Sequence, residues 1–235
     1  LRQGGNILAI QAMNNTVTSS DFLLAVELVS SKAQAGGVPS GVSPTAVRYV
    51  QPITLGQSAH VKARALAGTT WSALSEAVFA VGPVVESLRV SEIMYHPQDT
   101  GDPNDLNTEF IELTNIGGQA INLNLVCFTK GIDFTFGSTE LAPAQYLLVV
   151  KDVGAFEARY GPGLPVAGEY SGSLSNGGER IELLDALGEM IQTFSYADSW
   201  YGLTDGKGYS LTVKDPRTTD PNDYSESSAW RSSAT

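Results

Sequence analysis

The amino-acid sequence predicts an all-β protein whose main part is a β-sandwich. Short apolar or alternating runs, each closed by a turn signal, recur from Leu88 to Trp230, and no long helical pattern separates them. The 235-residue chain also carries 24 glycines and 11 prolines, which suits many short strands joined by tight turns. With 42% apolar and 17% charged residues, it can bury a core and does not have the composition of a disordered polar tract.

Residues 1–30 are predicted to form a hairpin of two strands. Asn6–Met13 alternates apolar with small or polar residues, a polar loop follows at residues 14–21, and Phe22–Leu28 continues the pattern. One hairpin is marginally stable in water, so it must pack on something else or be the remnant of an upstream β domain. The chain opens in the middle of a strand-like run, which predicts that it is part of a longer polypeptide.

Residues 31–44 are predicted to be a linker, because they are poor in large apolar side chains and rich in chain breakers. Residues 45–83 hold strand-like runs at Val47–Val50, Ala59–Leu66 and Ser75–Val81. The middle run alternates charged with small apolar residues, which is typical of a strand with one wet face.

The same residues resemble part of a small immunoglobulin- or fibronectin-like module of secreted bacterial proteins. The resemblance rests on Tyr49, Pro52–Leu55, Val61–Arg64 and Trp71–Ala77. The first strands of such a module are not evident in the sequence. We therefore expect a partial module over residues 45–83.

Residues 86–232 are predicted to form the sandwich. Their strand-like runs include Leu88–Pro97, Glu109–Asn115, Leu141–Val150, Arg180–Asp185, Met190–Tyr196 and Tyr209–Val213. One short helix is predicted at Val153–Tyr160, because Val153, Phe156 and Tyr160 recur at helical spacing.

These runs are similar to the lamin-tail domain, the Ig-like domain of nuclear lamins that also occurs in bacterial secreted proteins. The resemblance is carried by Ser91–Tyr95, Glu109–Asn115, Leu123, Phe134, Phe136, Leu141–Leu147, Leu174–Ile181, Asp205–Leu211 and Trp230. It implies an Ig-like β-sandwich over residues 86–232, preceded by an N-terminal strand-rich segment. The chain departs from the family at two packing positions. Val126 or Cys127 stands where the family carries a Trp, and Trp200-Tyr201 replaces its Trp-Pro pair.

The resemblance also implies a task. Such a domain is expected to be a non-catalytic interaction or adhesion module of a larger bacterial protein, extracellular or on the cell surface. Its partner would be a protein or a glycan. Two alternatives stay open: a carbohydrate-binding accessory domain of a multidomain enzyme, and a hydrolase in its own right.

Charge and apolar patterning exclude some classes of partner. The formal net charge is −11, and the basic residues are scattered, so the surface should repel phosphate backbones and anionic membranes. No apolar run approaches the ~20 residues of a membrane span, so we expect no membrane insertion and no nucleic-acid partner. Cys127 is the single cysteine, which rules out an intrachain disulfide and suggests a small buried apolar residue.

One loop is dense in oxygen ligands. Asp99, Asp102 and Asp105 lie within seven residues, and the tetrapeptide Asp102–Asp105 recurs as Asp220–Asp223. Calcium binds six to eight oxygens, so the first loop is a candidate calcium site, and no other cofactor is expected. Asp, Asn and Pro are also ordinary turn formers, and neither loop has the terminal Glu of the calcium-loop template.

Aromatic residues gather in a second loop. Trp200 and Tyr201 follow Tyr196 in a loop-like segment, and exposed rings can stack on sugars, so this pair is a candidate ligand surface. Rings of this kind also fill the core or the end loops of a sandwich.

No catalytic residue is predicted. His60 reads as an exposed strand position, and His96 lacks a second His or a Cys to complete a common transition-metal site. The spacing of Glu109 and Glu112, and of Glu179 and Glu182, places each pair on opposite faces of a strand, so these glutamates are interpreted as solvated strand positions, as is Glu92. Ser175–Gly178 lacks the lysine of a phosphate-binding loop and predicts a hairpin turn.

Overall fold

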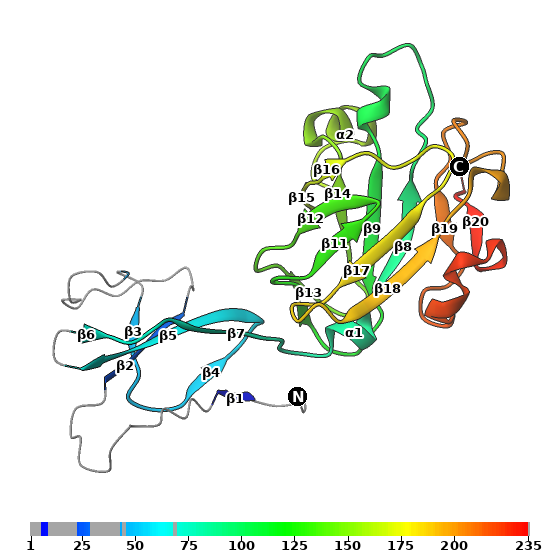
Figure 1. The fold of residues 1–235 in the computed structure, drawn as a ribbon. Coiled ribbons are helices and arrows are strands. Elements are labelled where there is room, and N and C mark those ends of the chain that lie inside the picture. The colour runs from blue at the N-terminus through cyan, green and yellow to red at the C-terminus, as the bar shows by residue number, and fades with distance from the viewer. Residues whose placement is uncertain (1–5, 9–22, 29–42, 44–45, 68–69, 235) are drawn as a thin grey trace. The chain divides into compact units, whose positions relative to one another are not determined.

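A computed structural model describes residues 6–8, 23–28, 43, 46–67 and 70–234 of the chain. The chain divides into two compact units, unit 1 (Leu1–Gly82) and unit 2 (Pro83–Thr235), and strands in mostly antiparallel sheets dominate both (Figure 1). The predicted all-β fold is confirmed. None of the described helices has the length and apolar character needed to cross a membrane.

Unit 1 is organised around one long strand, β5 (Ala59–Ala67). Its alternating sequence buries Val61 and Ala63 in a small cluster with Leu55. The other strands are β1 (Asn6–Leu8), β2 (Leu23–Leu28), β3 (Val47–Arg48), β4 (Ile53–Leu55), β6 (Thr70–Trp71) and β7 (Ser75–Phe79). Strand β5 pairs with β2, β6 and β7, and β2 also pairs with β3.

The hairpin predicted for residues 1–30 is not how the described residues pair. Strand β1 pairs with β4, and β2 pairs with β5, so both belong to unit 1. The physical reason is that β5 is long enough to pair with all six residues of β2, a register that local sequence does not reveal. The predicted linker at residues 31–44 lies, apart from Ser43, outside the described residues.

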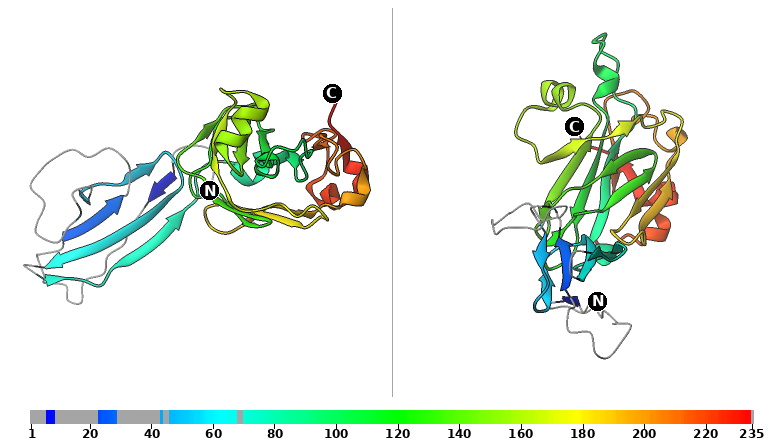
Figure 2. Two further views of the ribbon diagram at one scale, coloured as in Figure 1. Left: turned by 90° about the horizontal axis from the view of Figure 1, so that it is seen from above. Right: turned by 60° about the vertical axis from the view of Figure 1, so that its left-hand side comes forward.

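Unit 2 has two main sheets that face each other, as Figure 2 shows. The six-stranded sheet has the order β15-β14-β9-β8-β19-β20, with only β14 and β15 parallel. Its strands are β8 (Leu88–Met94), β9 (Phe110–Asn115), β14 (Tyr146–Val150), β15 (Val166–Glu169), β19 (Leu211–Val213) and β20 (Trp230–Ser232). The five-stranded sheet has the order β16-β12-β11-β17-β18. It comprises β11 (Cys127–Lys130), β12 (Ile132–Thr135), β16 (Ser171–Gly172), β17 (Arg180–Leu184) and β18 (Met190–Ser195). A two-stranded sheet of β10 (Ile121–Asn122) and β13 (Glu140–Leu141) completes unit 2.

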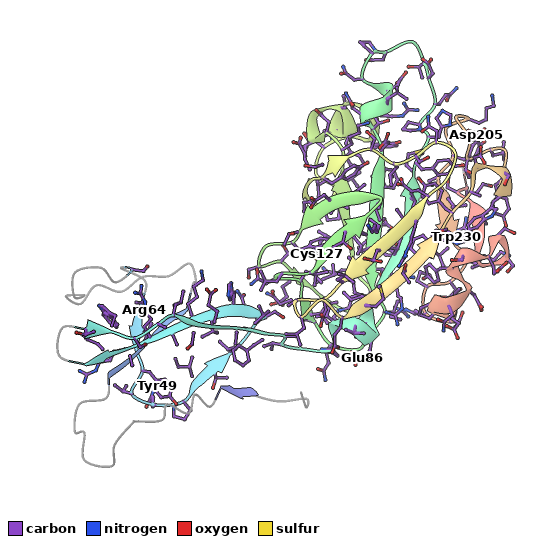
Figure 3. The ribbon with its side chains drawn as sticks, in the orientation of Figure 1. Tyr49, Arg64, Glu86, Cys127, Asp205 and Trp230 are labelled. Atoms are coloured by element: carbon purple, nitrogen blue, oxygen red, sulfur yellow. The ribbon has the colours of Figure 1, made fainter. Side chains whose placement is uncertain are left out.

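The core fills the space between the two main sheets. Alternate residues of each strand point inward, as Ile111 and Leu113 do on β9, and both are fully buried. The indole of Trp230, labelled in Figure 3, is also fully buried and lies 5.4 Å from the ring of Phe194 on β18. Its Nε1 donates to the carbonyl of Tyr224 at 2.8 Å, so the C-terminal segment is fixed to the core by packing and by a satisfied buried donor.

Helix α2 (Val153–Tyr160) covers part of the outer face of the six-stranded sheet, and its predicted bounds are confirmed. The carboxylate of Asp152 caps it by accepting from the amide of Ala155 at 2.7 Å, and Gly161 ends it with φ +91°. Phe156, on its apolar side, is buried against Met94, Phe110, Leu148 and Val150. The helix lies toward the β15 and β14 end of the sheet, whereas β19 and β20 form the opposite end (Figure 1).

The Ser175–Gly178 turn connects strands that are not paired with each other. The amide of Gly178 donates to the carbonyl of Ser175 at 3.1 Å, so the predicted turn is present. The predicted hairpin is wrong, because β16 before the turn pairs with β12, whereas β17 after it pairs with β11 and β18.

We expect Gly178→Ala to destabilise unit 2 by roughly 2–4 kcal/mol. Gly178 has φ +100°, and an added Cβ would lie 2.3 Å from the carbonyl oxygen of Tyr196, a backbone atom that cannot easily move. Gly177→Ala is the matched control, because a Cβ there meets no atom within 4 Å. Urea denaturation of both variants measures the difference, and equal midpoints would contradict this account.

Candidate functional site

The acidic loop predicted to bind calcium uses its carboxylates to shape its own backbone. The Oδ1 atoms of Asp99 and Asp102 accept from the amides of Gly101 and Asn104, both at 2.8 Å. Asp105 accepts from the amide of Thr100 at 2.5 Å and forms an ion pair with Arg159 at 3.0 Å. These contacts, led by the Thr100 amide, lower the pKa of Asp105. Across the described part of the chain, no three His, Cys, Asp or Glu side chains are arranged to hold a metal ion. The structure therefore does not bring the three carboxylates together as a metal-binding group.

The repeated tetrapeptide forms the same local structure in both places. Asp220, like Asp102, accepts from the amide two residues later, here Asn222 at 2.9 Å. A 3₁₀ turn starts within each motif, η1 (Asp105–Asn107) at the fourth residue of the first and η3 (Pro221–Ser225) at the second residue of the other. The repeat is explained by turn chemistry, in which Asp accepts from the backbone and Pro fixes the next residue.

The aromatic pair predicted as a ligand surface packs onto the core of unit 2. Trp200 is half-buried and lies 6.4 Å from the ring of Trp230. The hydroxyl of Tyr201 donates to the carbonyls of Ser227 at 2.9 Å and Trp230 at 2.8 Å. Both rings therefore hold the C-terminal segment in place while staying partly exposed, and their role as a ligand surface stays a prediction.

The remaining candidates are also engaged in protein contacts. The Nε2 of His60 lies 2.7 Å from Glu76, across the pair β5 and β7. The Nδ1 of His96 lies 2.6 Å from the carboxylate of Asp205, which Figure 3 labels in the loop between β18 and β19. Cys127 is partly exposed, not buried as predicted, because Val126 takes the fully buried position; burial still raises the pKa of its thiol, which disfavours the reactive thiolate.

Glu109 is the centre of a buried polar network that the sequence did not predict. Its side chain is only 4% exposed. It accepts from the hydroxyl of Tyr170 at 2.9 Å and the amide of Leu174 at 2.8 Å, and it pairs with the Nζ of Lys151 at 3.2 Å. The interpretation of Glu109 as a solvated strand position is wrong, because it precedes β9 and points between the two sheets.

Glu179 extends this buried network. It accepts from the amide of Ser175 at 2.6 Å and from the hydroxyl of Tyr196 at 3.2 Å. Burial, with the nearby charge of Glu109, raises the pKa of Glu179. Burial first, and then the adjacent carboxylates, also raise the pKa of Tyr170 and Tyr196 well above the ordinary tyrosine range, so both phenols stay protonated as donors. The carboxylates of Glu109 and Glu179 accept hydrogen bonds from other segments of the same chain, so the network joins these segments.

A row of charged and polar side chains crosses the outer face of the six-stranded sheet. Glu112 on β9 is paired in register with Glu92 on β8, Glu92 with Thr212 on β19, and Thr212 with Arg231 on β20. Ser91 Oγ donates to Glu112 at 2.7 Å, and Ser210 Oγ donates to Glu92. Burial, and then the charge of Glu92, raise the pKa of Glu112. Neither glutamate is a fully solvated strand position.

A groove of about 380 Å³ opens beside this row. Glu92, Ser210, Thr212 and Arg231 line its polar part, while Met94, Phe110 and Tyr160 line its apolar part. We call this the β8–β20 groove. Period-two alternation places Glu92 and Met94 on one face of β8, but only the fold shows that α2 ends beside them.

One family model matches a large part of unit 2. Residues 83–198 match the family model of the Lamin Tail Domain, which confirms the resemblance for this part of the chain. A crystal structure of a DUF4876 family protein from Bacteroides thetaiotaomicron VPI-5482 is similar to the chain at 10% sequence identity. That alignment has a TM-score of 0.39 and covers 94% of this chain and 90% of that chain. A comparison with curated proteins found no match.

We expect Glu109→Ala to destabilise unit 2 by roughly 3 kcal/mol, because it leaves the Tyr170 hydroxyl and the Leu174 amide unsatisfied and removes the counter-charge of Lys151. Glu157→Ala, an exposed position on α2, is the control and should change the free energy of unfolding by less than about 0.5 kcal/mol. Urea denaturation checks both, and a Glu109→Ala protein as stable as this control would show that the network is dispensable.

We expect Glu112→Gln to stabilise unit 2 by roughly 0.5–1 kcal/mol at pH 7, because it removes repulsion from the directly opposed Glu92 while an amide oxygen can still accept from Ser91. A carboxyl group whose pKa is raised by folding weakens the fold above that pKa and not below its unfolded pKa. The gain should therefore shrink as the pH falls, and vanish below about pH 4. A gain that persists at low pH would point to a cause other than charge.

Proposed function

We propose that this chain is a non-catalytic interaction module of a larger secreted or cell-surface bacterial protein, and that its partner is a protein with a basic surface. The observation that carries the proposal is the uneven distribution of charge. Of the 25 acidic residues, all but Asp21, Glu27 and Glu76 belong to unit 2. Five of the 14 basic residues belong to unit 1: Arg2, Lys32, Arg48, Lys62 and Arg64.

Many of the acidic side chains of unit 2 are exposed on its surface. Exposed carboxylates occur on widely separated elements, among them Asp99, Asp133, Glu140, Glu157, Glu189, Asp215 and Glu226. Three of the basic residues of unit 2, Lys151, Arg159 and Arg180, are already ion-paired with carboxylates of the same unit. A surface of this kind attracts a basic partner and accelerates its encounter, with a strength that falls as salt is added.

The contacts of the titratable residues support binding in preference to chemistry. Glu109, Glu179, Tyr170 and Tyr196 donate to or accept from one another or nearby backbone, and so join the two sheets and their loops. Trp200 and Tyr201 hold the C-terminal segment. Side chains that could act as acids, bases or sugar platforms are thus used to stabilise the sandwich.

We expect the 235-residue chain to bind basic peptides and proteins on an array, and to bind at least about tenfold more weakly when salt is raised from about 0.05 M to about 0.5 M. The readout is binding of the labelled chain to matched arrays of basic peptides, acidic peptides and glycans. Acidic peptides control for non-specific adhesion. Binding to glycans alone would replace this proposal with a carbohydrate-binding accessory, and binding insensitive to both charge and salt would contradict it.

A further inference from the structure

The β8–β20 groove combines an apolar wall with an acidic floor. Met94 and Phe110 are partners in register on β8 and β9, and the ring of Tyr160 packs edge-on against that of Phe110 at 5.6 Å. Glu92 lies two residues before Met94 on the same face of β8, and Ser210 holds its carboxylate from β19's side. A bound group would therefore meet apolar atoms at one end and a carboxylate at the other.

One carboxylate, Glu92, and one cation, Arg231, line the groove, and a second carboxylate lies opposite Glu92 on β9. Glu92 is directly opposite Glu112, and like charges in opposed positions repel each other. Arg231 lies two strands away at the edge of the sheet, with its Nη1 donating to the carbonyl of Ser232 at 3.3 Å. A cation near Glu92 would lower this repulsion.

A hydroxyl group also lies beside this carboxylate. The Oγ1 of Thr212 is buried and has no hydrogen-bond partner in the part of the chain that the structure describes. Thr212 lines the groove and is the register partner of Glu92. Because this atom is not accessible, the carboxylate of Glu92 is the acceptor that a ligand in the groove can reach.

We propose that the β8–β20 groove binds a lysine or arginine side chain of the protein partner, a proposal that rests on the proposed interaction function. The aliphatic stem packs on Met94 and Phe110, and the cationic end donates to the carboxylate of Glu92. Tyr160 adds an aromatic face at the mouth of the groove, where a cation is attracted to the ring. The volume of about 380 Å³ lies within the range of small ligand pockets.

The methionines of the chain provide a direct test. Met94 lines the groove, whereas Met190 is 42% exposed on β18 of the other sheet. The ¹³C-labelled methionine methyl groups are followed by NMR as acetyl-Gly-Lys-Gly-amide or its arginine counterpart is added to the full chain. We expect the Met94 methyl to shift saturably and the Met190 methyl to stay in place. Acetyl-Gly-norleucine-Gly-amide, which has a similar stem without charge, should shift neither.

Single substitutions test the contribution of the Glu92 carboxylate separately from that of the other groove residues. Glu92→Gln should weaken peptide binding at least tenfold. Its amide oxygen can still accept from Ser210, so we expect the variant to fold. An unchanged methyl spectrum of the free variant is the check on folding. Arg231→Ala should leave binding unchanged or tighten it, since it removes a competing cation. Glu140→Gln, an exposed carboxylate on β13, is the matched control and should have no effect.

The outcomes distinguish this inference from the proposed function. A Met94 methyl that does not respond, or a Glu92→Gln variant that binds as tightly as the original chain, overturns the groove as the site. If the chain still binds basic arrays in a salt-dependent manner, the interaction function stands and another surface carries it. If the Met94 methyl shifts and Glu92→Gln loses peptide binding while the chain binds none of the arrays, the groove is a cation site and the proposed interaction function is wrong.

Discussion

The six-stranded sheet of unit 2 has two faces, and both carry apolar side chains that must be covered. The inner face is covered by the five-stranded sheet, which together with it encloses the largest buried cluster among the described residues. The outer face is covered only in part, by the eight residues of α2 packed on Met94, Phe110, Leu148 and Val150. The position of that helix decides which side chains of the outer face become core and which become surface, and so creates the β8–β20 groove at its end.

Covering the inner face of the six-stranded sheet also buries polar groups inside unit 2. Segments that cross between the sheets carry backbone donors that water cannot reach, and buried donors need acceptors. Glu109 supplies them for Leu174 and Tyr170, and Glu179 supplies them for Ser175 and Tyr196. Burying these carboxylates is unfavourable in free energy, and their hydrogen bonds offset that penalty only while every member of the network is present.

The surface and the interior therefore use carboxylates in different ways. Inside, each charge is neutralised by local donors or by a cation such as Lys151. Outside, several carboxylates shape turns, as Asp102 and Asp220 do, and the exposed carboxylates together leave a net negative field. The cross-strand pair Glu92 and Glu112 falls between these cases, since both carboxylates are half-buried and like-charged, and Glu92 lines a groove. This combination is the reason why a cationic group of a partner is proposed to bind at Glu92.

The sequence by itself determined the class of fold, the bounds of α2 and most strands of unit 2, because period-two and period-3.6 patterns and turn residues are local signals. It also contained the repeated Asp-Pro-Asn-Asp turn, whose residues are ordinary turn formers and also left a calcium site open as a candidate. Only the tertiary structure decided the partners of β1 and β2, the non-hairpin connection at Ser175–Gly178 and the burial of Glu109. The physical reason is that strand pairing and carboxylate burial depend on residues far apart in sequence. Tyr170 and Leu174 lie some sixty residues from Glu109, and no local pattern brings them together.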